Sequence, residues 1–472
     1  MKKIFSLIAV TIIISIATVN ANNILLSNVS LNGQNTVSQF SLVNFDVSWE
    51  NSWRTITNEA NYDGAWIFVK FRKKTSSLWQ HATINTTGST MPSGSVIQTS
   101  ADGKGVWIYH TLPATDFTGN VNYTGAKIQW NYGTDGVLNT DSVEIRVFAL
   151  EMVYVPQGKF NLGSGGTDYD GFFEGSKTTP YSVTSETTPI TVANTVGNLY
   201  YNNSNGIAGD QGGPIPANFP KGFNPFWLMK YESSQQQYVD FLNNLDLTRA
   251  NNRYTGVFTG THPNLVAPFP ERAANTLSIA DGEAFADWAG LRPFTEMEYE
   301  KACRGFNQAS LPNEFVWGNT TISPTTGTTN TGFTNETAND GNANYGNNLA
   351  GGRPTRTGIY ATATSNRQQS GGTFYGIMDM SGNVTEPVIT VGNTQGRSFT
   401  NVNGDGTLNA IGDANVSTWP DIFVGAGYGL RGGYYSDLVA RLQLSDRYSG
   451  TYNAGFQNRA ANIGIRLART AE

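Results

Sequence analysis

The chain has 472 residues, a length that predicts two or three domains of ordinary size. Its formal net charge is −6, only 14% of its residues are charged, and it contains 52 glycines. This composition argues against a nucleic-acid partner, because no basic segment could neutralise a run of phosphates. A single cysteine, Cys303, excludes an intramolecular disulfide framework. The balance is typical of an exported protein that is rich in strands and loops.

The first 21 residues, "MKKIFSLIAVTIIISIATVNA", join two lysines to an apolar stretch and end on small residues. This pattern predicts a signal peptide that is cleaved near Ala21, so we expect a secreted, periplasmic or cell-surface protein. No later stretch approaches the roughly 20 apolar residues that a membrane helix needs. The sequence therefore predicts no membrane span.

Residues 22–149 predict an all-β sandwich. They contain short alternating or aromatic runs such as "FSLVNFDVSWE", "GAWIFVKFRKK" and "DSVEIRVFAL", each bounded by turn-forming residues. In "AWIFVKF" the alternation puts Trp66, Phe68 and Lys70 on one face of a strand. Ile67, Val69 and Phe71 lie on the other face, so one face is aromatic for much of its length, and most of these residues are expected in the core.

Residues 150–472 have a different pattern, which predicts an α+β domain with little regular secondary structure. Residues 163–223 form a polar, irregular stretch of a length that usually marks an insertion or a functional surface. Helices are expected in "ESSQQQYVDFLNNL", in "SIADGEAFADWAG" after Ser278, and in "TEMEYEKACRG", where Thr295 and Glu298 have the spacing of a capping box. Long loops follow Arg304.

Several segments of this second region have a familiar order: "EMVYVPQGKFNLGS", "FWLMKYESSQQQYVDFLN", "LSIADGEAFADWAGLRPFTEMEYEKACRG", "YGIMDMSGNVTEPV", "LRGGYY" and "GIRLAR". Together they resemble the formylglycine-generating enzyme family, also called the sulfatase-modifying factor domain. The resemblance covers roughly residues 150–470. It implies an irregular variant of the C-type lectin fold with two embedded calcium ions.

The resemblance implies that one calcium lies in the turn within residues 375–389. The matching ligand positions are the side chains of Asp379 and Glu386 and the carbonyl groups of Gly382 and Val384. Calcium accepts six to eight oxygen ligands, backbone carbonyls included, so the residue types suit the ion. The alternative is that Asp379 caps a turn and Glu386 is solvated.

The second calcium of the family would fall near "ANDGNANYGNN", with the Asn342 side chain and the carbonyl group of Ala343 as candidate ligands. A further loop, "NVNGDGTLNAIGD", spaces Asn401, Asn403 and Asp405 as an EF-hand loop would. Its twelfth position is Gly412 and supplies no bidentate carboxylate, so an Asx-rich turn is the favoured interpretation there.

The family's redox chemistry lacks its ligands in this sequence. Members that make formylglycine hold copper with two cysteines shortly after an Arg-Gly-Gly segment, and here that segment is followed by "YYSDLVARLQLSDRYSG", which has Asp437 and Leu442 near those positions. A related branch uses three histidines for iron, but the three histidines of this chain are scattered. We therefore expect neither copper nor iron, and Cys303 is interpreted as a buried helix residue.

The favoured function is a non-catalytic, calcium-supported binding module for an extracellular glycan, peptide or protein. The expected pocket residues are Tyr434, Tyr435, Asp437, Arg447 and Tyr448, since aromatic faces and charged groups suit a polar ligand.

Three alternatives remain open at this point. One is a metal-dependent oxidoreductase of the same superfamily with altered chemistry, and another is a structural component of a cell-surface assembly. The third is carboxylate catalysis on a glycan, for which Asp379, Glu386, Asp437 and Asp446 are the candidate acids.

Overall fold

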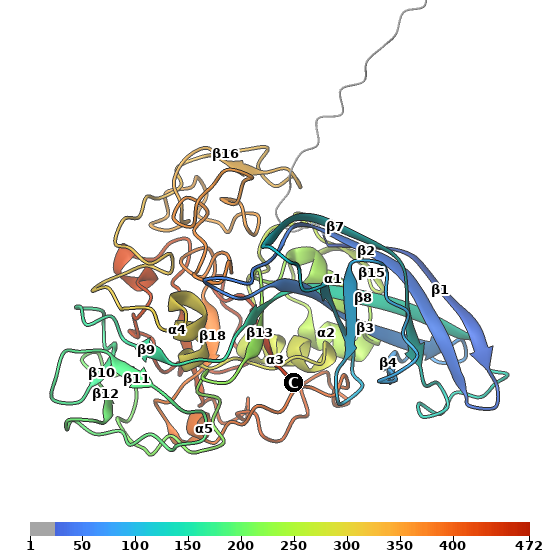
Figure 1. The fold of residues 1–472 in the computed structure, drawn as a ribbon, viewed down its shortest axis with the longest axis horizontal. Coiled ribbons are helices and arrows are strands. Elements are labelled where there is room, and N and C mark those ends of the chain that lie inside the picture. The colour runs from blue at the N-terminus through green and yellow to red at the C-terminus, as the bar shows by residue number, and fades with distance from the viewer. Residues whose placement is uncertain (1–23) are drawn as a thin grey trace, which may run out of the picture.

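The structure is a computed structural model that describes residues 24–472 (Figure 1). The predicted signal peptide lies outside the described residues. The strands are β1 Leu25–Asn35, β2 Phe40–Arg54, β3 Asp63–Lys73, β4 Gln80–His81, β5 Ser95–Thr99, β6 Val106–His110, β7 Phe117–Trp130, β8 Val143–Val155, β9 Phe160–Leu162, β10 Phe172–Glu174, β11 Tyr181–Val183, β12 Leu199–Tyr201, β13 Phe226–Met229, β14 Thr259–Thr261, β15 Asn264–Val266, β16 Thr328–Thr329, β17 Thr337–Ala338, β18 Glu386–Ile389, β19 Tyr428–Arg431 and β20 Ala468–Thr470. The helices are α1 Gln235–Leu242, α2 Leu247–Arg253, α3 Ile279–Trp288, α4 Glu296–Arg304, α5 Thr394–Arg397 and the 3-10 helix η1 Val439–Leu442.

The N-terminal part is a β-sandwich, as predicted. A three-stranded antiparallel sheet in the order β1-β2-β7 faces a larger sheet in the order β20-β13-β8-β3-β6-β5. The apolar residues between the two sheets, among them Val43, Phe45 and Trp49 of β2 and Ile67 and Val69 of β3, form one continuous core. Burial of this core stabilises the sandwich.

Both faces of β3 are buried, and they meet different partners. Ile67 and Val69 face the sandwich core, whereas Trp66 and Phe68 belong to the core of the second region. The Trp66 indole N–H donates a 2.8 Å hydrogen bond to the Ala289 carbonyl oxygen just after α3. The alternation predicted for "AWIFVKF" is confirmed, and the structure adds that its two faces belong to two different cores.

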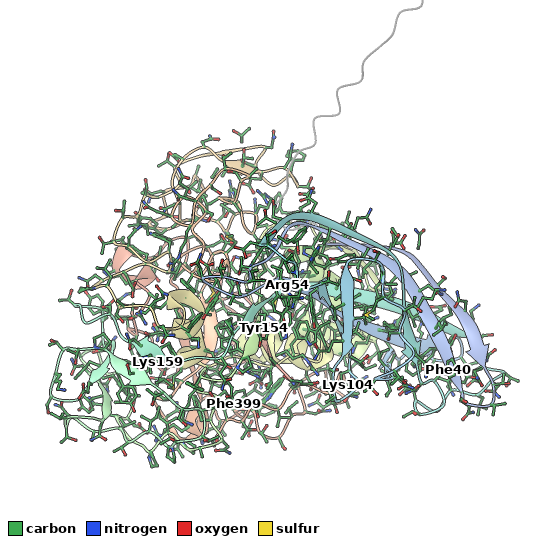
Figure 2. The ribbon with its side chains drawn as sticks, in the orientation of Figure 1. Phe40, Arg54, Lys104, Tyr154, Lys159 and Phe399 are labelled. Atoms are coloured by element: carbon green, nitrogen blue, oxygen red, sulfur yellow. The ribbon has the colours of Figure 1, made fainter. Side chains whose placement is uncertain are left out.

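The larger sheet joins the two regions. Strand β8 pairs with β3 on one side and with β13 on the other, and β20 from the end of the chain pairs with β13. The expected boundary between residues 149 and 150 falls within β8. Figure 2 shows Arg54 and Tyr154 in the middle of the molecule at this junction, whereas Phe40 lies at the far end of the sandwich.

The three expected helices are confirmed, and α3 and α4 begin at the capping residues that the sequence predicted, Ser278 and Thr295. Ser234, Ser278 and Thr295 cap α1, α3 and α4, and all three form complete capping boxes. Helices α2 and α5 were not predicted, although Asp246 and Asn393 cap them with side-chain acceptors. The remainder of the second region consists of short two-stranded ladders and loops, which matches the expected irregular α+β domain. Among residues 24–472, no helix has the length and apolar character to cross a membrane.

Candidate functional site

The turn within residues 375–389 leads into β18, which pairs with β19 so that Glu386 lies opposite Arg431. The chain reverses sharply here: Asp379, Gly382 and Asn383 all have positive φ angles of 61°, 89° and 65°. The Gly382 N–H donates to the Gly432 carbonyl oxygen at 2.7 Å. The turn is thus clamped against the Arg-Gly-Gly segment.

Three buried carboxylates meet at this turn. Glu386 Oε1 accepts a 2.5 Å hydrogen bond from Nε of the fully buried Arg466. Glu232, which the sequence did not single out, accepts hydrogen bonds from the Asn383 amide and from the Val384 N–H. Asp379 Oδ2 accepts from the Gly358 N–H at 2.5 Å.

Arg466 and Arg356 are the cations whose charges act on these three carboxylates. Burial raises the pKa of Glu386 to about 7, and it also raises the pKa of Asp379 and of Glu232, because each charge must leave water and the carboxylates repel one another. Glu386 Oε2 is buried and accepts no hydrogen bond. A proton or a further cation would satisfy that oxygen.

The fit of calcium to this turn is partial. The unpartnered Glu386 oxygen and the hard-oxygen chemistry of the residues suit the ion. However, Arg466 already supplies one positive charge to Glu386. In the described part of the chain, no group of three or more His, Cys, Asp or Glu side chains is placed to hold a metal.

The weaker calcium candidates have other partners. The Asn342 side-chain oxygen accepts from the Ser323 N–H at 2.9 Å, and its amide nitrogen donates to the Gln368 carbonyl oxygen. The carbonyl oxygen of Ala343 accepts from the Thr325 N–H. These hydrogen bonds join two loops, and both oxygens that could bind calcium already accept a hydrogen bond.

The EF-hand-like loop is an Asx turn. Asp405 Oδ1 accepts from the backbone N–H and the hydroxyl group of Thr407. The Asp405 N–H itself donates to Asp287 Oδ1 in α3. The loop therefore packs against α3.

Helix α4 carries a buried ion network that explains two of the predicted residues. Arg447, expected to line a pocket, is instead completely buried, and its Nε lies 2.7 Å from Glu296 Oε2. Arg431 lies 3.0 Å from Glu300 Oε1. The expectation for Arg447 was wrong because its partner, Glu296, lies 151 residues earlier in the chain. Both arginines anchor the segment after β19 to α4.

The segment between these two arginines presents Tyr434, Tyr435 and Asp437 at the surface. Tyr434 and Tyr435 are partly exposed and pack edge to face with ring centroids 5.5 Å apart. Their neighbours Leu438 and Val439 are 71% and 43% exposed. Burial raises the pKa of Asp437, which lies between the tyrosines and η1.

Beside them an arginine is held by two tyrosines. The Arg441 guanidinium lies 3.2 Å from the ring centroid of Tyr448 and 4.3 Å from that of Tyr169. It also lies 3.5 Å from Asp446, whose pKa burial raises to about 7. The sequence analysis missed Tyr169, which comes from the 163–223 stretch that was predicted as a functional surface or an insertion.

We call this surface the tyrosine face. It consists of Tyr169, Tyr434, Tyr435, Asp437, Leu438, Val439, Arg441 and Tyr448. The charge of Arg441 lowers the pKa of Asp437, and the charge of Asp437 raises the pKa of Tyr434. The two halves of the face are therefore close enough to interact electrostatically.

The cysteine of the chain is placed as a structural residue. Cys303 lies in α4, is completely buried, and burial raises the pKa of its thiol well above the ordinary value. A nucleophilic cysteine needs an accessible thiolate. Cys303 therefore packs as a small apolar side chain, as predicted.

The profile of the sulfatase-modifying factor enzyme 1-like domain matches residues 142–471. The chain belongs to the sulfatase-modifying factor family. In the part that the family domain covers, the buried Arg431, Glu300 and Glu296 network supports the segment after β19.

Treponema denticola variable protein 1 is a similar solved structure, with 13% sequence identity and a TM-score of 0.35; the alignment covers 69% of this chain and 96% of that protein. No curated protein matches the chain.

Proposed function

We propose that this member of the sulfatase-modifying factor family is an exported, non-enzymatic binding module that recognises a protein or peptide through the tyrosine face. The observation that carries the proposal is the exposure of Leu438 and Val439 among four tyrosines and an arginine. Tyrosine and arginine are enriched at the centres of protein interfaces, and tyrosine provides a large contact area at low entropic cost.

The support beneath the face suits recognition. Arg447 and Arg431 fix the segment after β19 to Glu296 and Glu300 of α4, and all four side chains are buried. A binding surface that rests on rigid, hydrogen-bonded residues loses less entropy when a partner binds.

The experiment is selection of peptides from a random displayed library on the immobilised protein, followed by affinity measurement of the enriched peptides. Leu438→Asp places a charge in the face and is expected to weaken their binding at least about tenfold. Leu112→Asp is the matched control, because Leu112 is 70% exposed and lies outside the face. Equal loss in both variants, or none in Leu438→Asp, would contradict the proposal.

Calcium support is a separate element of the proposal. Its ligands would be the carboxylates of Asp379 and Glu386 and the carbonyl groups of Gly382 and Val384, and the ion would neutralise charge that Arg466 leaves uncompensated. Elemental mass spectrometry of the purified protein before and after chelation tests it. One calcium per chain, with a lower melting temperature after chelation, is the expected result. Calcium at background level would mean that protons and Arg466 alone hold the turn.

Export is the third element, and it rests on residues 1–21. We expect the protein outside the cytoplasm to begin near Asn22. Mass spectrometry of its N-terminal peptide checks the cleavage position.

A further inference from the structure

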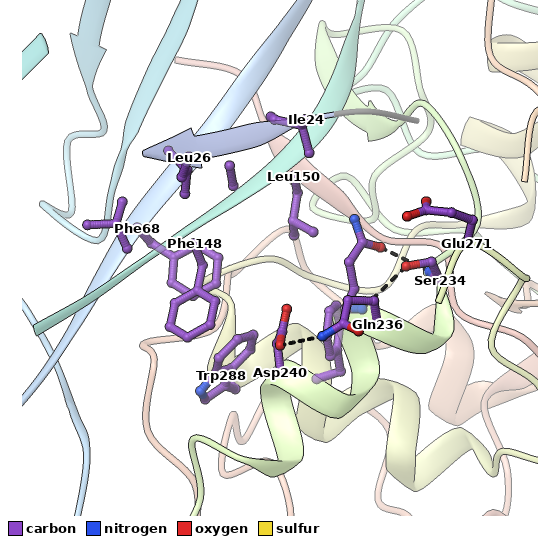
Figure 3. A pocket seen from close by; sticks show the side chains of 14 residues that line it. Ile24, Leu26, Phe68, Phe148, Leu150, Ser234, Gln236, Asp240, Glu271 and Trp288 are labelled. Atoms are coloured by element: carbon purple, nitrogen blue, oxygen red, sulfur yellow. Dashed lines mark hydrogen bonds between the residues drawn. The ribbon is translucent and has the colours of Figure 1, made fainter. Parts of the chain in front are cut away.

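A cavity of about 260 Å³ opens between the sandwich and the helices of the family domain (Figure 3). Residues of β1, β3 and β8 form one wall. Residues of α1 and α3, together with Glu271 from the loop between β15 and α3, form the other wall. This place is separate from the tyrosine face, so the inference below does not rest on the proposed function.

The strand wall and the floor of the cavity are apolar. Phe148 is partly exposed and stacks on Phe68 with ring centroids 5.3 Å apart, while Trp288 of α3 meets Phe148 edge to face at 4.9 Å. Leu150 and Ile24 continue the wall, and Figure 3 shows both on the strand side of the pocket, across from the helix that carries Asp240. An aromatic or aliphatic group would be well accommodated here.

Two carboxylates face this apolar wall. Asp240 of α1 accepts one hydrogen bond, 2.9 Å long, from the amide of Gln236. No hydrogen bond from a described residue reaches the carboxylate of Glu271. Burial raises the pKa of Asp240 and of Glu271, and the charges of Arg146 and Arg356 oppose this rise only in part.

The nearby cations are engaged elsewhere. Arg146 acts on Asp240 from a distance, but its guanidinium donates to the Asn243 carbonyl oxygen and lies 4.6 Å from the ring centroid of Trp79. Arg356 acts on Glu271 and donates to the Glu336 carbonyl oxygen. Lys70 donates to the carbonyl oxygen of Gly406.

We propose that this cavity binds a small molecule in which a primary ammonium group is joined to an apolar body of about the size of a phenyl ring. The ammonium, with its three N–H donors, would lie beside Asp240, whose one hydrogen-bond donor is the neutral amide of Gln236. The apolar body would pack against Phe148 and Leu150, and the aromatic face would add a cation–π attraction.

The test compares two probes of nearly equal shape, 2-phenylethylammonium and the neutral 2-phenylethanol, by calorimetry at about pH 8, where an alkylammonium keeps its charge. The ammonium is expected to bind at least about tenfold more tightly than the alcohol. In Asp240→Asn/Glu271→Gln this preference should disappear while binding of the alcohol stays unchanged. Asp168→Asn is the matched control, because Asp168 is a partly buried acid with a raised pKa outside this cavity and outside the tyrosine face, and the variant should keep the preference.

The wild-type protein alone can overturn the proposal. It would do so if 2-phenylethylammonium and 2-phenylethanol bound with equal affinity, or if the ammonium did not bind. A preference that persists in the folded double variant would overturn it as well. Near-ultraviolet circular dichroism establishes that the variants retain the native fold.

Discussion

The Lys230 ammonium lies 3.0 Å from Asp63 Oδ2, in a position where both side chains are buried. Asp63 begins β3 of the sandwich and Lys230 directly follows β13 of the family domain. Glu151 of β8 lies 3.1 Å from the same ammonium, and the indole N–H of Trp49 donates to the same Asp63 oxygen. The charge cluster therefore ties both sheets of the sandwich to the second region.

Lys230→Met tests this junction. The substitution keeps much of the side-chain volume but leaves Asp63 and Glu151 buried without their cation, so the free energy of unfolding should fall by about 3–5 kcal/mol. Urea denaturation followed by fluorescence measures it. Lys177→Met is the control, because the Lys177–Glu174 pair lies at the surface with 43% of the lysine side chain exposed, and it should change stability little.

A second prediction concerns pH. Burial raises the pKa of Glu283 to about 8, and its Oε1 accepts a 2.7 Å hydrogen bond from the Tyr428 hydroxyl. The folded protein therefore holds a proton that the unfolded chain releases near pH 4.5. The contribution of Glu283 is complete below that pH and is lost as the pH rises to about 8.

Glu283→Gln keeps the acceptor oxygen and does not titrate. The difference in unfolding free energy, wild type minus variant, is expected to fall by up to about 1.4 kcal/mol per pH unit between about pH 5 and 8. Urea titrations at several pH values measure this difference. A difference that is constant over this range would contradict the protonated state of Glu283.

Local sequence patterns predicted the helices and the strand faces, but they did not predict which charged side chains pair with one another. Ser278, Thr295 and the alternation around Trp66 act through neighbours in sequence, and the expected helices and strand faces are present. By contrast, Arg466 lies 80 residues from Glu386, and Arg447 lies 151 residues from Glu296. Such contacts depend on topology, which periodicity and spacing do not encode.

The same limit applies to the candidate site. Tyrosines 434 and 435 could be placed at a surface because they follow a recognisable motif, whereas Tyr169 joins them through a contact between Arg441 and the distant 163–223 stretch. A long polar stretch shows that a segment has an unusual role, but it does not show which residue reaches the site.

A third prediction concerns the turn within residues 375–389. A Cβ atom at Gly382 would lie 2.5 Å from the backbone oxygen of Asn344, and φ there is 89°. Gly382→Ala should therefore destabilise the protein through both left-handed strain and a backbone clash.

Gly197→Ala separates the two effects, because Gly197 has a φ of 87° and open space around the added atom. It should lose about 1 kcal/mol from strain alone, and Gly382→Ala should lose clearly more. Thermal unfolding of both variants makes the comparison. Equal losses would show that the turn can move away from Asn344.

The last prediction separates two neighbouring arginines by their roles. Arg447 is completely buried against Glu296, so Arg447→Met leaves that carboxylate without its closest cation and should lower the unfolding free energy by about 3–5 kcal/mol. Arg441 keeps 15% of its side chain exposed between Tyr448 and Tyr169, and its carboxylate partner Asp446 has a pKa that burial raises to about 7. Arg441→Met therefore leaves a carboxylate that a proton can neutralise, and it should cost clearly less stability than Arg447→Met. If the tyrosine face binds ligands, Arg441→Met should weaken the binding of selected peptides at a protein concentration and temperature where the variant is fully folded. Denaturation and affinity measured on the same preparations decide this. A loss of stability as large as that of Arg447→Met would place Arg441 in the framework of the fold, because its main role would then be to hold the folded state together.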